Sequence, residues 1–477
     1  MRCYLYPSWH EAKMTPDDIN ARFLAMKAAS RQELAPDHAT RLQHLTALRR
    51  LILDHRKALG AAISEDFGQR PQAETDLAEV FPSLQEIAHA RRHLGRWMRR
   101  RPVAPGIWFR PGRAWVQPQP LGVVGIVVPW NYPLQLTIGP LVGALAAGNR
   151  AMVKLSEHAL AFAALFAQLA PDYLPQDRVA VVTGGPETGM AFSALAFDHL
   201  LFTGSTAVGR RVMAAAAANL VPVTLELGGK SPALIAPDAR LDHAVARIMA
   251  GKMLNAGQTC IAPDYVLLHR DHLDQFIAKA KGWVERHYPK LETNPDYSRI
   301  INDAQFARLT AALEAAQAGG AEILPLSTAP ADPARRMMPP VLVTGAEGPL
   351  AEDEIFGPIL PVVPYDDLRT AVAYITARPR PLAFYPFTES AETRDLLLAS
   401  VSAGGVTVND TLLHVAQSGL PFGGVGPSGI GAYHGQAGFE RMSHLLPVFA
   451  QSRINGADWL APPYGARFRA LMRLMLR

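Results

Sequence analysis

Short runs rich in β-branched residues alternate with helical stretches in the first half of the chain, and this rhythm limits the possible folds more than any other feature. The runs span residues 123–128, 151–154, 179–182, 199–202 and 221–225. Strands that alternate with helices predict a parallel sheet with helices on both faces, which is a doubly wound α/β fold. Ligands of such sheets bind at the carboxyl ends of the strands, so we expect a site there.

The length of the chain indicates that this sheet is only one part of the molecule. At 477 residues the chain exceeds the usual size of one core, and 49% hydrophobic with 19% charged residues is typical of a folded enzyme. We expect a helical N-terminal layer over about 17–101 and an arm or edge strand over the proline-marked residues 110–120. The expected division is a dinucleotide-binding domain (14–109 and 123–227), a second α/β domain that is catalytic (228–410), a bridging or oligomerisation element (110–122 and 411–449) and a C-terminal tail (450–477).

Charge, cysteine content and hydropathy narrow the partners and the compartment. The basic clusters behind the net charge of +5 lack interleaved aromatic residues, so we predict no nucleic acid partner. Two cysteines cannot form a disulfide framework and a nucleophilic thiol needs a reducing compartment, which favours the cytoplasm. The basic amphipathic pattern of residues 464–477 predicts a helix that docks on its own protein or on a partner subunit rather than on a membrane. Residues 1–13 are expected to be loosely attached, with Met14 as an alternative start.

A cysteine and a glutamate provide the candidate chemistry. Cys260 ends the stretch 255–260, and Glu226 opens the stretch 226–230. A thiolate adds to a carbonyl carbon and holds the product as a thioester, which water activated by a neighbouring carboxylate hydrolyses. We therefore predict Cys260 as a nucleophile that its site activates as the thiolate, and Glu226 as the general base. Because a hydride must leave between these two steps, the pair indicates oxidation of an aldehyde to an acid.

Two loops at strand ends provide further candidate residues. Residues 202–210 place Gly204 and Ser205 at a helix start, where free N–H groups and the helix dipole suit a pyrophosphate. The loop 129–133 carries Asn131, whose amide can donate to a developing oxyanion. Both loops follow strands of the predicted sheet, so we expect them at its carboxyl edge.

Lys154 and Glu157 end the second strand, where a ribose is usually bound in this fold. A carboxylate there accepts hydrogen bonds from ribose hydroxyls and repels a 2′-phosphate, whereas the lysine softens that bias. NAD is therefore favoured, with NADP left open. The histidines show no pairing at metal-ligand spacing, so we predict no metal.

Five motifs along the chain resemble those of a known family. They are Phe-Thr-Gly-Ser-Thr at 202–206, Glu-Leu-Gly-Gly-Lys at 226–230, Gly-Gln-Thr-Cys at 257–260, Glu-Ile-Phe-Gly-Pro at 354–358 and Pro-Phe-Gly-Gly-Val-Gly at 421–426. In order and spacing they resemble the aldehyde dehydrogenase superfamily, from about residue 39 to 449. Residues 257–265 and 431–435 are similar to its class 3, and residues 406–414 resemble the bacterial coniferyl-aldehyde dehydrogenases of that class.

The resemblance implies a role for each matching position. Cys260 is then the nucleophile, Glu226 the general base, and Asn131 with the Cys260 main-chain N–H the oxyanion hole. An NAD coenzyme, with NADP possible, is implied to contact Trp130, Lys154, Glu157, Gly204, Ser205, Gly209, Leu227, Glu354 and Phe356. The implied substrate is an aromatic aldehyde such as coniferyl aldehyde, or a medium-chain aldehyde. We also expect a homodimer, with the arm in the subunit contact.

Some positions depart from the family pattern, and other functions stay open. Leu155 follows Lys154 where a proline is common, which leaves the coenzyme preference in doubt, and Pro386 predicts that its strand lies at a sheet edge. The glycine-rich residues 422–435 predict a tight interdomain turn rather than a phosphate site. The alternatives are a coenzyme A-acylating dehydrogenase, against which Glu226 counts, a cysteine thioester hydrolase, or a non-catalytic protein with the same fold.

Overall fold

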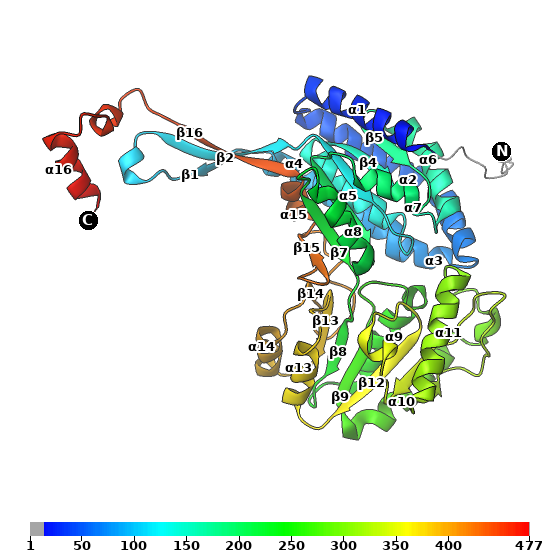
Figure 1. The fold of residues 1–477 in the computed structure, drawn as a ribbon. Coiled ribbons are helices and arrows are strands. Elements are labelled where there is room, and N and C mark those ends of the chain that lie inside the picture. The colour runs from blue at the N-terminus through cyan, green and yellow to red at the C-terminus, as the bar shows by residue number, and fades with distance from the viewer. Residues whose placement is uncertain (1–13, 477) are drawn as a thin grey trace.

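The computed structural model describes residues 14–476 and arranges them around three sheets (Figure 1). The first sheet has six strands in the order β15-β7-β6-β3-β4-β5, and all pairs are parallel except β15 with β7. These strands are β3 (Val123–Val127), β4 (Arg150–Lys154), β5 (Val179–Val182), β6 (His199–Gly204), β7 (Val223–Leu227) and β15 (Gly429–Ile430). Each of the five predicted runs forms a strand, and the α/β class is confirmed.

Helices cover both faces of this sheet because its strands alternate their side chains between two cores. Val124 and Ile126 of β3 pack with helices α2, α4, α5 and α6, whereas Val123 packs with α1, α7 and α8. The helices are α1 (Pro16–Gln32), α2 (His38–Phe67), α3 (Gln72–Thr75), a π-helical turn (Asp76–Val80), α4 (Phe81–Trp97), α5 (Gln135–Ala147), α6 (Leu160–Tyr173), α7 (Pro186–Ser193) and α8 (Thr206–Ala217). The predicted helical N-terminal layer is therefore present. Cys3 and the other residues before Met14 lie outside the described part of the chain.

A second α/β unit follows, with a seven-stranded sheet in the order β10-β11-β12-β9-β8-β13-β14. Its strands are β8 (Pro232–Ile235), β9 (Tyr265–His269), β10 (Glu322–Pro325), β11 (Val341–Thr344), β12 (Ile359–Tyr365), β13 (Ala383–Phe387) and β14 (Gly405–Val406). Its longer helices are α9 (Leu241–Met253), α10 (Leu273–His287), α11 (Asp303–Ala318), α13 (Leu368–Thr376) and α14 (Ala391–Ser400). The pairs are parallel except β10 with β11.

The expectation that Pro386 marks a sheet edge is wrong, because β13 lies between β8 and β14 and all its residues are buried. The carbonyl of Pro386 accepts a hydrogen bond from the N–H of Asn409 (2.9 Å), on the side where β14 has already ended at Val406. The donor that proline lacks would face the same side. No ladder bond is lost there, so an interior proline is tolerated.

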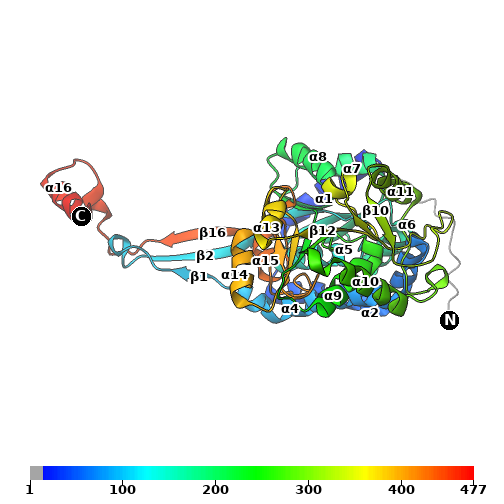
Figure 2. The same cartoon turned by 90° about the horizontal axis from the view of Figure 1, so that it is seen from below.

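The third sheet is a narrow arm that extends away from the body (Figures 1 and 2). It joins β1 (Arg101–Val103), β2 (Arg113–Pro120) and β16 (Ser443–Ala450) in antiparallel pairs, with β2 in the centre. Of the predicted arm or edge strand over residues 110–120, residues 113–120 form the central strand of this arm. Its prolines fit because β1 pairs only with residues 114–116 of β2, which leaves Pro118 and Pro120 with a partner on one side.

The C-terminal tail lies beyond the outer end of the arm (Figure 1). Its helix α16 (Ala466–Met475) has no buried residue and contacts the 3-10 turn Ala457–Leu460. The predicted amphipathic helix is present, but it does not dock on its own subunit as the sequence allowed. The reason is geometric, since β16 carries the chain away from the body before the helix begins. Within residues 14–476, no helix combines the length and apolarity needed to span a bilayer.

Candidate active site

A cavity of about 590 Å³ lies at the carboxyl ends of the first sheet, facing the second α/β unit. Cys260, Glu226 and Asn131, which are far apart in the sequence, all line it. Several residues predicted to bind a coenzyme line it as well, namely Trp130, Gly204, Ser205, Leu227, Glu354 and Phe356. The position agrees with the rule that ligands of doubly wound sheets bind at this edge.

The loop that carries Cys260 is held in one conformation by its own backbone. After α9 the chain takes a left-handed turn, with φ of 52° at Asn255, 50° at Ala256 and 75° at Gly257. A side chain at Gly257 would place its Cβ 2.3 Å from the main-chain oxygen of Gly357, so only glycine fits. Gln258 then anchors the loop through hydrogen bonds to Arg299 O (2.9 Å) and from Ile301 N (2.9 Å). The thiol two residues later is therefore presented by a rigid turn.

The environment of the Cys260 thiol disfavours its ionised form. Burial, and then the carboxylates of Glu354 and Glu226, raise the pKa of this thiol well above its usual range. The sequence-based expectation that the site activates the thiolate is therefore not met by the protein groups alone. The side chain is still partly exposed to the cavity, so a substrate and solvent can reach the sulfur.

Glu226 is the second reactive group, and it is buried without a partner. It sits near the end of β7, where main-chain pairing with Thr203 of β6 and Gly429 of β15 fixes it from both sides. Its exposed fraction is 2%, and neither carboxylate oxygen has a hydrogen-bond partner. Burial raises the pKa of Glu226 well above its usual range, which makes its ionised form a stronger base than a carboxylate in water.

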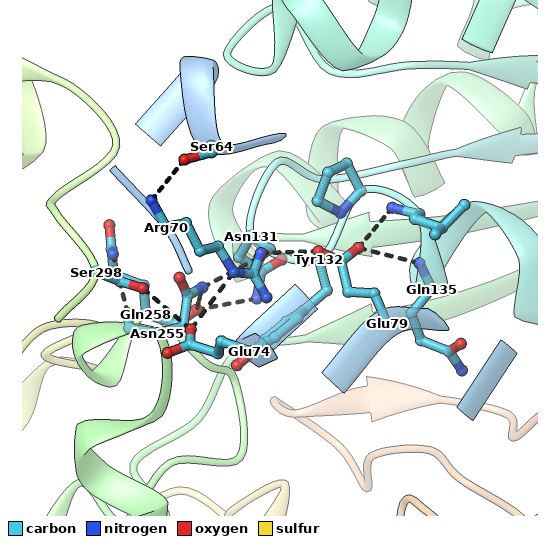
Figure 3. A network of polar contacts seen from close by, with 12 residues as sticks. Ser64, Arg70, Glu74, Glu79, Asn131, Tyr132, Gln135, Asn255, Gln258 and Ser298 are labelled. Carbon is cyan, nitrogen blue, oxygen red and sulfur yellow. Dashed lines mark hydrogen bonds and ion pairs between the residues drawn. The ribbon is translucent and has the colours of Figure 1, made fainter. Parts of the chain in front are cut away.

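Asn131 lies in the loop between β3 and α5 and is linked to the cysteine loop. Its Nδ2 donates to the main-chain oxygen of Gln258, two residues before Cys260, across a long 3.3 Å. Its own main-chain oxygen accepts from Asn255 Nδ2 (3.1 Å) and from Arg70 Nη1 (3.1 Å) (Figure 3). The amide and the thiol are thus tied to one buried hydrogen-bond network.

Glu354 and Phe356 approach the cavity from the second unit. The Oε1 atom of Glu354 is buried and has no partner, and burial together with Asp264 raises the pKa of Glu354 to about 8. A Cβ at Gly228 would lie 1.9 Å from Glu354 Oε2, so the glycine is required for the carboxylate to reach its place. Phe356 has a φ of 52° and packs edge-on against Trp130 with ring centroids 5.3 Å apart. Strained backbone of this kind is common at ligand sites.

The residues present fit a dinucleotide coenzyme. Ser205 caps the N-terminus of α8 through a bond from Val208 N (3.4 Å), and Gly204 precedes it at the cavity wall. The buried hydroxyl of Thr203 has no partner and lines the same cavity as Glu354, so a ligand rich in hydroxyls would satisfy both. Such unpaired polar atoms around a large cavity are what a ribose requires.

Three predicted coenzyme residues lie outside the wall of this cavity. Lys154 and Glu157 pair with each other at the carboxyl end of β4, with Nζ and Oε2 2.5 Å apart. Gly209 lies inside α8, where a Cβ would be 2.5 Å from Leu227 Cδ2. The absence of a side chain at Gly209 therefore lets α8 approach β7 closely. Coenzyme contact at Lys154, Glu157 and Gly209 stays a prediction.

The sequence analysis missed Lys252, which is fully buried behind the cavity. Its Nζ has no hydrogen-bond partner and lies 3.9 Å from Asp264 Oδ1, and burial lowers the pKa of Lys252 to about 8. Asp264 in turn accepts from Lys230 Nζ (2.8 Å) and from Ile355 N (3.1 Å), next to Glu354. A lone lysine within the apolar residues 248–254 was the available signal, because burial of an ammonium group requires a partner.

The glycine-rich segment contributes to the cavity wall. Phe422 lines the cavity, and β15 adds a short edge to the first sheet. A Cβ at Gly423 would lie 2.1 Å from the oxygen of Gly431, which shows that these glycines allow close backbone packing. Among residues 14–476, no group of three His, Cys, Asp or Glu side chains is arranged to hold a metal ion.

Comparison with known proteins agrees with the geometry of this site. The model of the aldehyde dehydrogenase family matches residues 8–446. A probable coniferyl aldehyde dehydrogenase of Pseudomonas aeruginosa is 48% identical, over 96% of both chains, and aldehyde dehydrogenase family 3 member A2 of Pongo abelii is 42% identical, over 89% of this chain and 86% of its own.

Solved structures extend the likeness to the fold and the coenzyme. The substrate-bound state of Staphylococcus aureus AldH has a TM-score of 0.91 and 35% identity, and covers 96% of this chain and 99% of its own. The NAD+ complex of an aldehyde dehydrogenase from Bacillus cereus has a TM-score of 0.83 and 26% identity, with 93% and 90% coverage. NAD(P) is accordingly the coenzyme of this chain, as the sequence implied. The chain belongs to the aldehyde dehydrogenase family, and the relatives it resembles include coniferyl aldehyde dehydrogenases and a class 3 member of that family.

Proposed function

We propose that this protein oxidises an aldehyde to the carboxylic acid by covalent catalysis at Cys260, with hydrolysis of the resulting thioester. One observation carries the proposal: a thiol, an unpaired buried carboxylate and an amide donor, from three distant segments, line one cavity. That combination supplies a nucleophile, a base and an oxyanion donor. The unpaired coenzyme-facing groups Thr203 and Glu354 support an oxidation rather than a simple acyl transfer.

The first step forms a bond between Cys260 Sγ and the aldehyde carbon. The thiol proton leaves to solvent through the cavity, and the carbonyl oxygen becomes an oxyanion. Asn131 Nδ2 and the main-chain N–H of Cys260 are the proposed donors to that oxygen. The 3.3 Å bond from Nδ2 to Gln258 O is long, so it can be exchanged for a stronger bond to a charged oxygen.

The second step re-forms the carbonyl as a hydride leaves the same carbon, which gives a thioester on Cys260. NAD(P), when bound, supplies the acceptor for this hydride. Glu354 is proposed to accept hydrogen bonds from the ribose beside the nicotinamide, and Phe356 with Trp130 to pack against it. Gly204 and Ser205, at the start of α8, are proposed to face the pyrophosphate.

The third step is hydrolysis of the thioester. Glu226 takes a proton from water, the hydroxide adds to the thioester carbon, and the C–S bond breaks to release the acid and the thiolate. The buried position of Glu226 strengthens its ionised form as a base. Its carboxylate oxygens make no other hydrogen bond that this step would have to break.

For the substrate and the coenzyme we propose coniferyl aldehyde or a related aromatic aldehyde, and NAD rather than NADP. The relative from Pseudomonas aeruginosa supports the substrate, as does the aromatic side chain of Phe422, which lines the cavity and has no proposed coenzyme contact. Glu157 supports NAD because a carboxylate disfavours a 2′-phosphate. We further propose a cytoplasmic homodimer whose subunits contact through the arm, since the arm exposes the edges of its sheet.

The test combines steady-state and rapid kinetics on a panel of aldehydes, with NAD and NADP assayed in parallel. Glu226→Gln should keep a stoichiometric burst of reduced coenzyme and then slow by roughly 10²–10⁴-fold, because only hydrolysis needs the base. The product should be the free acid. A normal steady rate from Glu226→Gln, or an acyl-coenzyme A product, contradicts the proposal.

A further inference from the structure

Arg70 is a buried cation to which the proposed mechanism gives no role. Its side chain is fully buried, just after the end of α2. The guanidinium lies over the rings of Phe67 and Tyr132, with its carbon 5.3 and 4.8 Å from their centroids. Burial of a charge is unfavourable unless it is paired, so the partners of Arg70 indicate what it does.

The contacts of Arg70 lead to the loop that carries Asn131 (Figure 3). A single nitrogen, Nη1, donates both to Glu79 Oε1 (2.8 Å) and to the main-chain oxygen of Asn131 (3.1 Å). Nε lies 3.4 Å from Glu74 Oε1, which accepts in turn from the hydroxyl of Ser298. Two carboxylates therefore hold the guanidinium while it holds the loop.

Glu79 secures the other end of the same loop. Its second oxygen, Oε2, accepts from the N–H groups of Leu134 (2.7 Å) and Gln135 (3.2 Å) at the start of α5. That helix has no side-chain cap from its own N-cap residue, so Glu79 provides the acceptor from a distant segment. The chain from β3 to α5 is thus fixed at Asn131 and at the helix start by one ion pair.

We propose that Arg70 is a positioning residue of the oxidation: clamped by Glu79, it fixes the main chain of Asn131 and so aims the amide that receives the oxyanion. This inference depends on the oxyanion role proposed above for Asn131.

A purely structural role explains the arrangement less well. A buried ion pair is on average no more stabilising than a well-packed apolar pair. Here the pair also leaves two nitrogens of Arg70, Nε and Nη2, without a hydrogen-bond partner. Its distinct effect is to fix geometry, and a misplacement of about 1 Å at a reacting group lowers a rate by roughly 10²-fold.

The experiment measures the rate constant of the burst of reduced coenzyme in the parent, in Asn131→Ala, in Arg70→Met, in the double variant and in one control variant. Arg41→Met is the matched control, because Arg41 is also buried and donates to Ala146 O (2.9 Å) at the opposite end of α5. Asn131→Ala should slow the burst by roughly 10²–10³-fold and Arg70→Met by roughly 10²-fold. The double variant should be no slower than Asn131→Ala within about twofold, since both act on one interaction.

The coenzyme dissociation constant should stay within about twofold of the parent in every variant, because Arg70 and Glu79 do not line the cavity and Asn131 has no proposed coenzyme contact. A parent-like burst from Arg70→Met, or losses that multiply in the double variant, overturns the inference and leaves the proposed function intact. A parent-like burst from Asn131→Ala overturns the oxyanion role and this inference with it. If Arg70→Met fails to fold, Arg70→Lys replaces it in the same comparison of single and double variants. This substitution keeps the buried charge but not the guanidinium geometry.

Discussion

The cavity between the two α/β units and the arm that leaves the body follow opposite rules. At the cavity, the carboxylates of Glu226 and Glu354 are withdrawn from water with oxygens that have no partner. In the arm, all three residues of β1 are exposed, and Arg101 pairs at the surface with Glu440 of the helix Gly435–Arg441, with Nη1 and Oε1 2.7 Å apart. The carboxylates at the cavity are withdrawn from water, whereas the charged side chains of the arm strands, Arg101 and Arg113, are exposed.

The carboxylates at the cavity depart from the rule that buried polar atoms have hydrogen-bond partners. Unpaired buried polar atoms are rare in folded proteins because each one destabilises the fold. Four such atoms belong to residues of the cavity wall that also contains Cys260, where a substrate, water or coenzyme can satisfy them: Thr203 Oγ1, both carboxylate oxygens of Glu226 and Glu354 Oε1. Changes at the cavity should therefore alter activity strongly and folding little, whereas changes in the tail should alter neither within a single subunit.

The largest expected effect comes from Cys260→Ala. Removal of the nucleophile should lower turnover by about 10⁴-fold or more, because no other group of the cavity can form the covalent intermediate. Coenzyme binding should be kept, since the sulfur holds the substrate and not the dinucleotide. Titration of coenzyme fluorescence together with steady-state turnover checks both; residual turnover above 1% of the parent, as a rough limit, contradicts the assignment.

The second-largest effect is expected from a methyl group at position 228, which should weaken coenzyme binding. Gly228→Ala places a Cβ 1.9 Å from Glu354 Oε2, so the carboxylate must move away from the proposed ribose position. Loss of the proposed hydrogen bond from the ribose to Glu354 costs about 1–3 kcal/mol, which predicts a coenzyme dissociation constant raised by roughly 5–150-fold. Gly282→Ala is the matched control, because nothing lies within 4 Å of its added Cβ in helix α10. Equal coenzyme affinity in the two variants would show that Glu354 does not bind the coenzyme.

The pH dependence of stability offers a finer comparison. The folded pKa of Glu354, about 8, lies above the 4.5 of an ordinary glutamate, so its contribution favours the fold below pH 4.5 and is lost as pH rises through about 8. The loss is at most about 1.4 kcal/mol per pH unit. Denaturant unfolding of the coenzyme-free protein between pH 5 and 8 should show this slope reduced in Glu354→Gln. The variant Glu440→Gln, at a partly exposed position beside the base of the arm, should keep the parent slope, and an equal reduction of the slope in both variants would contradict the assignment to Glu354.

The smallest effect is expected from truncation after Ala450. Helix α16 has no buried residue, so its removal should change the free energy of unfolding of the body by less than about 0.5 kcal/mol. Turnover per site should also be kept, measured with the panel of aldehydes. A clear fall in turnover with unchanged folding would mean that the tail reaches the cavity of another subunit.

Particular strands and residues show how much of the structure could be predicted from the sequence. The strand at 179–182 was predicted to the residue, and the run at 221–225 was displaced by two, because β-branched alternation is a local signal. Cys260, Glu226 and Asn131 were found through local motifs and do share one cavity. The clamp of Arg70 on Asn131 gave no such signal, since its partners lie 9 and 61 residues away.

The sequence by itself determined the order of strands and helices, the reactive groups, and the glycines that their turns require, such as Gly257. These follow from backbone sterics and side-chain periodicity, which act over a few residues. Only the tertiary structure decided two other properties. One is the raised pKa of the Cys260 thiol and of Glu226, and the other is the interior position of Pro386 in its sheet. The physical reason is that desolvation and Coulomb fields depend on which segments surround a group, and those segments meet only when the two units pack together.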